Sequence, residues 1–125
     1  MSENRIVRDL HNKLVDAQLY AFPVRGKIFV SESQGVYIIS DGEGRALHVG
    51  STKYGKGGLN QRLYNHISKT GVLYNEFLKP NGINLRDGYF FRFIELEDAR
   101  KRALVEALTA GLLCPEHIGT GVKRD

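Results

Sequence analysis

Two short β-rich runs with a turn between them are the feature that most limits how this chain can fold. The runs cover residues 35–39 (GVYII) and 46–49, and residues 41–44 (DGEG) lie between them. β-branched and aromatic residues favour strands, whereas glycine beside acidic residues favours a tight turn. Together the three segments predict a β-hairpin.

The predicted hairpin brings two titratable rings onto one face of a sheet. A four-residue loop at 41–44 sets Ser40 opposite Arg45 and Tyr37 directly opposite His48, whereas a two-residue loop sets the two rings diagonally. Rings placed side by side in this way are suited to proton transfer. The alternative is a cross-strand pair that only packs.

Helical periodicity surrounds the hairpin. The pattern predicts helices over residues 5–19, 58–69, 72–79 and 97–113, and strands over 27–30 and 89–94. The main order is helix, hairpin, helix, strand, helix. This order predicts an α+β domain with a small, mostly antiparallel sheet.

Length and composition bound the class of protein. The chain has 125 residues, of which 42% are hydrophobic and 26% charged, which is typical of one soluble globular domain. We expect residues 1–34 to form an N-terminal helix and connector, and residues 35–125 to form the main domain. A single cysteine, Cys114, fits a reducing compartment. Charges throughout the first twenty residues exclude a signal peptide, and no apolar run is long enough for a membrane span, so we expect a cytoplasmic protein.

The positive charge is concentrated in one segment. The net charge is +4, yet residues 44–80 hold six basic side chains against one acidic, Glu76. A local basic segment favours a polyanionic partner. The alternative is a solvated lysine-rich face.

The helix predicted over 58–69 carries Arg62 and His66 four residues apart, so that they share one face. An arginine beside a histidine, with no acid between them, suits a phosphate. The alternative is two solvated residues at the edge of the core. The preceding loop, residues 50–58 (GSTKYGKGG), offers backbone N–H groups that could cradle phosphate, but it matches neither common nucleotide-binding pattern.

The last predicted helix carries one carboxylate on a face of small apolar residues. That carboxylate, Glu106, is expected to be partly buried and therefore to need a cation. Arg102, one turn earlier, is one candidate. A Mg²⁺ ion whose other ligands are water and phosphate oxygens is the other.

Several of these residues occur in an ordered set of motifs. The set is Gly35-Val36-Tyr37, then His48-Val49-Gly50 followed by Ser51-Thr52-Lys53, then Arg62-x-x-x-His66, and finally Glu106 on the last helix. This set resembles the signature of the GIY-YIG nuclease family over about residues 35–115. The resemblance implies a three-stranded antiparallel sheet flanked by helices.

The same resemblance implies a divalent-metal-dependent endonuclease that hydrolyses DNA phosphodiester bonds. It assigns Tyr37 as general base or proton relay, Arg62 to the scissile phosphate, and Glu106 to Mg²⁺ or Mn²⁺. His66 would contact phosphate or help to move protons. The implied substrate-binding residues are Ser51, Lys53 and Lys56.

Two positions depart from the family pattern. His48 stands where the family most often has tyrosine, so that the proton path can differ, and it is retained among the catalytic candidates. The stretch 115–119 lacks the asparagine that many members carry, and His117 is the candidate to replace it. A non-catalytic nucleic-acid-binding or interaction module on the nuclease scaffold is the alternative function. The first helix is a candidate homodimer contact.

Overall fold

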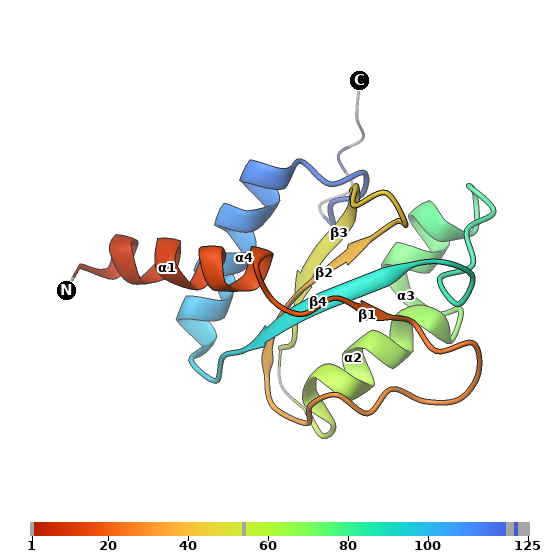
Figure 1. Cartoon of the computed structure of the whole chain (residues 1–125), viewed down its shortest axis with the longest axis horizontal. Coiled ribbons are helices and arrows are strands. Elements are labelled where there is room, and N and C mark those ends of the chain that lie inside the picture. Colours follow the sequence, from red (N-terminus) through yellow and green to blue (C-terminus); the bar gives the residue numbers. More distant parts are fainter. Residues whose placement is uncertain (1, 54, 120–121, 123–125) are drawn as a thin grey trace.

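The computed structural model describes residues 2–53, 55–119 and 122, and its core is an antiparallel sheet with helices on both faces (Figure 1). This arrangement confirms the α+β class. In chain order the elements are α1 (Glu3–Val15), β1 (Tyr20–Ala21), β2 (Gly35–Ser40), β3 (Ala46–Ser51), α2 (Gly58–Ile67), α3 (Gly71–Leu73), the π-helical turn η1 (Tyr74–Leu78), β4 (Phe90–Glu95) and α4 (Ala99–Leu113).

The sheet has four strands in the order β1-β4-β2-β3, so the expectation of three strands was wrong. The additional strand is β1, in which Tyr20 pairs with Phe91. Residues 27–30, predicted as a strand, form none. A two-residue strand has no period of its own, and its partner lies some seventy positions along the chain, so local sequence gives no signal for it.

The predicted hairpin forms, but its register differs from the one expected for a four-residue loop. Tyr37 pairs with Gly50 rather than with His48, and a bulge between Ile39 and Ser40 shifts the ladder. The bulge leaves Leu47 without a partner across the strand pair. Tyr37 and His48 are therefore diagonal neighbours on one face, with ring centroids 6.4 Å apart.

Strand β2 is the centre of the molecule, and all six of its residues are buried because both of its faces are covered. Tyr37 and Ile39 point into a core that also contains Leu59 and Leu63 of α2. Val36 and Ile38 point into the opposite core, between the sheet and helices α1 and α4 (Figure 1).

Helix α1 packs on α4 and ends at Val15, four residues before the predicted end. Its buried residues are Val7, His11 and Leu14, which follow helical spacing. The apolar face of α1 is thus covered within the same chain, and any contact between two copies would use its other face. In the described part of the chain, no helix is both long and apolar enough to span a bilayer.

Candidate active site

A cleft of about 600 Å³ gathers most of the predicted site residues from three elements. Strand β3 and the residues after it supply His48, Ser51 and Lys53, helix α2 supplies Arg62 and His66, and helix α4 supplies Glu106. The ring of His117, which follows α4, also lines the cleft.

Tyr37 and His66 form a buried pair beside the cleft. The tyrosine hydroxyl lies 2.6 Å from Nε2 of His66. Burial raises the pKa of Tyr37 to about 12, although the nearby charge of Arg62 acts in the opposite direction. Burial lowers the pKa of His66 to about 3, and repulsion from the His48 ring when protonated and from Arg62 acts in the same direction. Both side chains are therefore neutral near pH 7, and the phenol donates to the imidazole.

The Tyr37 phenolate is costly to form despite the positive charge beside it. Arg62 favours the phenolate, but desolvation has the larger effect on the pKa of Tyr37. The phenol is completely buried, with 0% of its surface exposed. The Tyr37 hydroxyl already donates to the neutral ring of His66. Tyr37 can therefore pass its proton to His66 without becoming a phenolate only if its oxygen receives a second proton in the same step.

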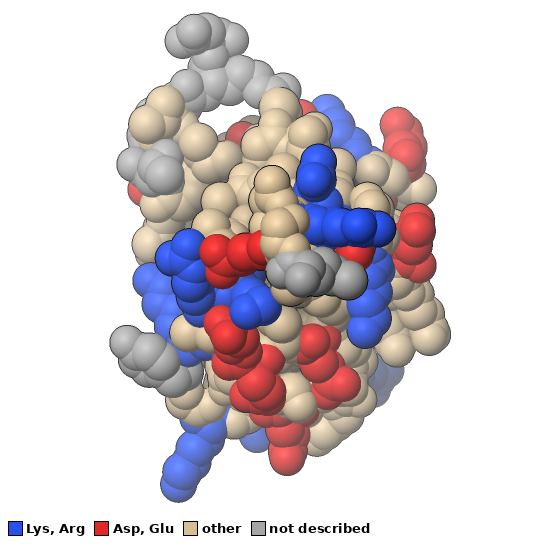
Figure 2. Space-filling model, turned by 90° about the vertical axis from the view of Figure 1, so that its left-hand side faces the viewer, with Lys and Arg blue, Asp and Glu red and all other residues tan. Residues whose placement is uncertain are grey.

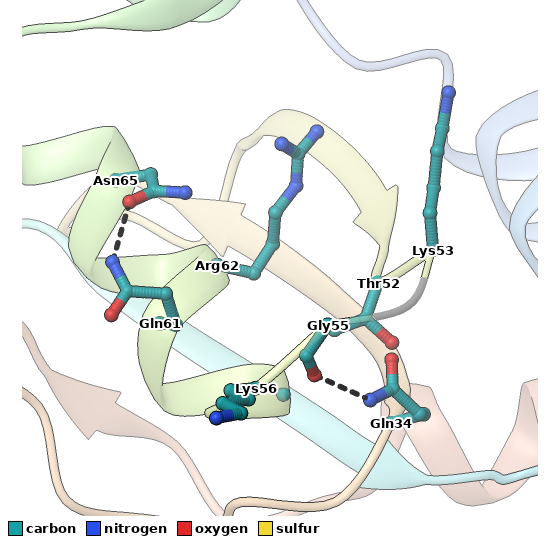
Figure 3. A pocket seen from close by; sticks show the side chains of 9 residues that line it. Gln34, Thr52, Lys53, Gly55, Lys56, Gln61, Arg62 and Asn65 are labelled. Carbon is teal, nitrogen blue, oxygen red and sulfur yellow. Dashed lines mark hydrogen bonds between the residues drawn. The ribbon is translucent and has the colours of Figure 1, made fainter.

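Arg62 lines the cleft with a guanidinium that is only partly buried. Its Nε atom is buried and has no hydrogen-bond partner among residues 2–53, 55–119 and 122. Figure 3 shows the side chains of Arg62 and Lys53 extending in the same direction from α2 and from the end of β3. A cation with an unpartnered donor, flanked by a second cation, is suited to a phosphodiester.

Glu106 is half-buried and accepts a hydrogen bond from the hydroxyl of Ser51. The partial burial confirms the prediction, but the pairing with Arg102 was wrong. Arg102 is buried and its guanidinium donates to four backbone carbonyls, those of Thr52, Lys53, Leu96 and Glu97.

The donor set fits a hydrated Mg²⁺ or Mn²⁺. Within the described residues, no group of three or more His, Cys, Asp or Glu side chains could enclose a metal ion. Glu106 is instead a single carboxylate at an open cleft, with one oxygen oriented by Ser51. Mg²⁺ in proteins commonly uses one or two carboxylates and completes its shell with water and phosphate oxygens.

The loop before α2 is arranged differently from the predicted phosphate cradle. The backbone N–H groups of Leu59 and Asn60 donate to the carbonyls of Ser33 and Ser31, so these helix-starting donors are occupied. Lys56 instead lines a smaller hollow of about 170 Å³ together with Lys53 and Arg62 (Figure 3).

The basic segment 44–80 does not form one continuous strip. Arg45 lies at the hairpin and pairs with Asp41 and Glu116, at 3.3 and 3.4 Å. Lys69 and Lys79 line a separate hollow beside η1. Only three of the six basic side chains gather at the candidate site: Lys53, Lys56 and Arg62.

The opposite end of the molecule carries both signs of charge. Figure 2 shows basic and acidic side chains close together on the side from which α1 projects. One such pair joins the two helices there, with Arg100 of α4 2.9 Å from Glu3 of α1.

Sequence comparisons neither support nor oppose an assignment. No family model matches the chain, and no curated protein matches it.

Sequence reasoning had left His117 without a defined partner, and the structure places it against His48. Their Nδ1 atoms are 3.1 Å apart, across 69 residues of chain. The signal in the sequence was only the missing asparagine in the stretch 115–119, which singled out this histidine as a replacement.

Proposed function

We propose that this protein is a divalent-metal-dependent endonuclease of the GIY-YIG type that hydrolyses DNA phosphodiester bonds. One observation carries the proposal. A single cleft combines a cation with an unpartnered donor, a carboxylate and a neutral imidazole that is hydrogen-bonded to a buried tyrosine hydroxyl behind it. These are an anion holder, a metal ligand and a proton path, which hydrolysis of a phosphodiester needs together.

Arg62 binds the scissile phosphate in this mechanism. Its guanidinium offers several N–H donors to phosphate oxygens and stabilises the charge that develops on them in the transition state. Lys53 and Lys56 neutralise neighbouring phosphates, since both line the hollow next to Arg62.

Tyr37 and His66 move the proton. The Tyr37 oxygen receives a proton from the attacking water while its own proton passes to Nε2 of His66, 2.6 Å away, a step that requires water to reach a phenol that is completely buried in this structure. This concerted transfer avoids a free phenolate, which the raised pKa of Tyr37 makes costly. His66 is available as the acceptor because its lowered pKa keeps it neutral.

Glu106 would hold Mg²⁺ or Mn²⁺, with Ser51 fixing the orientation of the carboxylate. When bound, the metal ion supplies stabilisation of negative charge at the leaving oxygen. The remaining metal ligands would be water and phosphate oxygens.

The raised pKa of Tyr37 is also the observation that favours the second candidate, a module that binds nucleic acid without cutting it. Incubation with plasmid and with single-stranded oligonucleotides, with Mg²⁺ or with chelator, separates the two. The nuclease predicts Mg²⁺-dependent cleavage that Glu106→Ala abolishes and that Glu43→Ala, in the exposed hairpin turn, retains. Binding without cleavage under every condition would establish the second candidate.

A further inference from the structure

A chain of hydrogen bonds leads from the cleft to the surface. Nδ1 of His48 lies 3.1 Å from Nδ1 of His117, and Nε2 of His117 lies 2.9 Å from a carboxylate oxygen of Glu76. Both histidines are buried, whereas the side chain of Glu76 is 46% exposed. The three residues come from β3, the segment after α4, and η1.

The backbone holds this chain of contacts in place from both sides. The His117 N–H donates to the carbonyl of Leu47, and the residues around His117 and His48 form a parallel bridge. On the other side, the π-helical turn η1 sets both Glu76 and Phe77 against the His117 ring. π-Helical turns are uncommon and occur frequently at functional sites.

The donor and acceptor roles in this series of hydrogen bonds follow from the carboxylate of Glu76 at its surface end. A carboxylate oxygen only accepts, so Nε2 of His117 carries the hydrogen. When the His117 ring is neutral it has one donor and one acceptor, so its Nδ1 accepts a hydrogen from Nδ1 of His48, whereas a protonated His117 would reverse this bond. With His117 neutral, Nε2 of His48 carries a lone pair. The ring of His48 lines the cleft, and its hydrogen bonds within residues 2–53, 55–119 and 122 go to the ring and backbone of His117.

The charge state of His48 makes its tautomer decisive. Burial, together with repulsion from Arg62 and from the His117 ring whenever that ring is protonated, lowers the pKa of His48 to about 4. The other titratable groups near this ring are His66 and Tyr37, whose rings lie 5.6 and 6.4 Å from it. His48 is therefore neutral near pH 7, and only the position of its one hydrogen decides whether the cleft meets a donor or an acceptor.

We propose that His117 and Glu76 are positioning residues that hold His48 as the Nδ1–H tautomer, with Nε2 accepting a hydrogen bond from the attacking water. The role of the water rests on the proposed nuclease function, whereas the tautomer does not. In this arrangement His48 orients the water beside Tyr37, which takes the proton. In this proposal Glu76 orients His117, His117 orients His48, and His48 orients the attacking water.

Nitrogen NMR of the full chain with labelled histidines at pH 7 tests the tautomer directly, because protonated and bare ring nitrogens differ strongly in chemical shift. A His48→Gln variant identifies the signals of His48 among the four histidines. We expect hydrogen on Nδ1 of His48 and on Nε2 of His117. Glu76→Ala and His117→Ala should each allow the Nε2–H form of His48, whereas Glu76→Gln retains an accepting oxygen and should preserve the wild-type pattern. Hydrogen on Nε2 of His48 in the wild type, or an unchanged pattern in both alanine variants, overturns the proposal.

Cleavage kinetics of the same variants test the role in the reaction. Glu76→Ala should lower kcat about 10- to 100-fold, as loss of an outer orienting partner typically does, with KM nearly unchanged. Glu76→Gln should restore most of the rate, and the melting temperature of each variant checks its folding. An unchanged kcat in Glu76→Ala, with an active wild type, overturns the orienting role. An inactive wild type refutes the nuclease itself and with it the orienting role, while the NMR measurement still decides the tautomer.

Discussion

The two faces of the sheet each bury a histidine against a hydroxyl, yet only one of them carries a candidate site. On the α2 face, His66 lies 2.6 Å from the hydroxyl of Tyr37. On the α1–α4 face, His11 lies 2.8 Å from the hydroxyl of Thr109. The pairs are similar in distance and burial.

The surroundings of the two pairs make the difference. His66 lines a cleft that also contains Arg62 and Glu106. The rings of Tyr37 and His48 lie 5.5 and 5.6 Å from the His66 ring. The core around His11 is built from aliphatic side chains such as Leu14 and Val105. A buried imidazole–hydroxyl pair is thus not enough to indicate a catalytic role. The pair on the α2 face is a candidate because it adjoins an open cleft that contains charged side chains.

The largest expected effect falls on the α2 face. Tyr37→Phe removes the proton path and should lower the cleavage rate about 10²- to 10⁴-fold while DNA binding is retained. Tyr20→Phe is the matched control, because Tyr20 is partly buried on the same sheet and stacks on Phe91 at 5.5 Å. Single-turnover cleavage measures both rates, and full activity of Tyr37→Phe would refute the proton relay.

Next in size is a cavity on the α1–α4 face. Leu14→Ala removes a completely buried side chain and should lower the free energy of unfolding by about 2–5 kcal/mol. Urea denaturation measures this loss. The cleavage rate of the folded fraction should not change, and a larger loss of activity than of folded protein would show that the two faces are coupled.

Acid should destabilise the protein through the α2 face. His48 and His66 have pKa values of about 4 and about 3 when folded, against about 6.5 for an unfolded chain. Between pH 6.5 and 5 the unfolded chain binds protons that the folded chain does not, so stability falls as the pH falls.

Each buried histidine contributes at most about 1.4 kcal/mol per pH unit to this slope. His66→Gln should reduce the slope by about that amount, as measured by urea denaturation at pH 6.5, 6 and 5. The carboxyl groups with lowered pKa, such as Asp41 and Asp98, titrate mainly below this range. Equal slopes in the wild type and in His66→Gln would contradict the neutral state assigned to His66.

The smallest effect concerns two glycines. Gly111 is exposed inside α4, and an added Cβ meets open space, so Gly111→Ala should stabilise the protein by up to about 1 kcal/mol. A Cβ on Gly50 would collide with the Tyr37 ring, so Gly50→Ala should displace this tyrosine and lower activity. Thermal unfolding and cleavage assays of both variants measure this difference. Equal changes in melting temperature and in cleavage rate for Gly111→Ala and Gly50→Ala would contradict it.

Local patterns in the sequence predicted the helices and the hairpin, because these elements depend on residues that are close together in the chain. The spacing of Leu59, Leu63 and Ile67 predicted α2, and all three are buried. The turn at 41–44 predicted the hairpin, but nothing local indicated the bulge at Leu47, because both registers bury the same face.

Contacts between distant segments were beyond such patterns. Arg102 is one turn from Glu106, so that a helical ion pair was one of the two alternatives for this carboxylate, yet backbone carbonyls from distant segments bind the guanidinium instead. For the same reason nothing in the sequence indicated the contact between Glu76 and His117. This contact depends on how η1 and the segment after α4 pack against each other in the folded protein. The candidate site itself was accessible mainly through the ordered motifs.

Arg102 also influences how precisely the side chains of the candidate site are positioned. Its guanidinium joins the carbonyls after β3 to those before α4, which lie more than forty residues apart in the chain. Lys53 is itself one of the bound residues after β3, and Glu106 lies on α4, which begins two residues after Glu97, so that the position of one relative to the other depends on a cation outside the cleft lining. A lysine ammonium is too compact to reach both sets of carbonyls, and the precision of the reaction centre would therefore be sensitive to even this charge-conserving exchange.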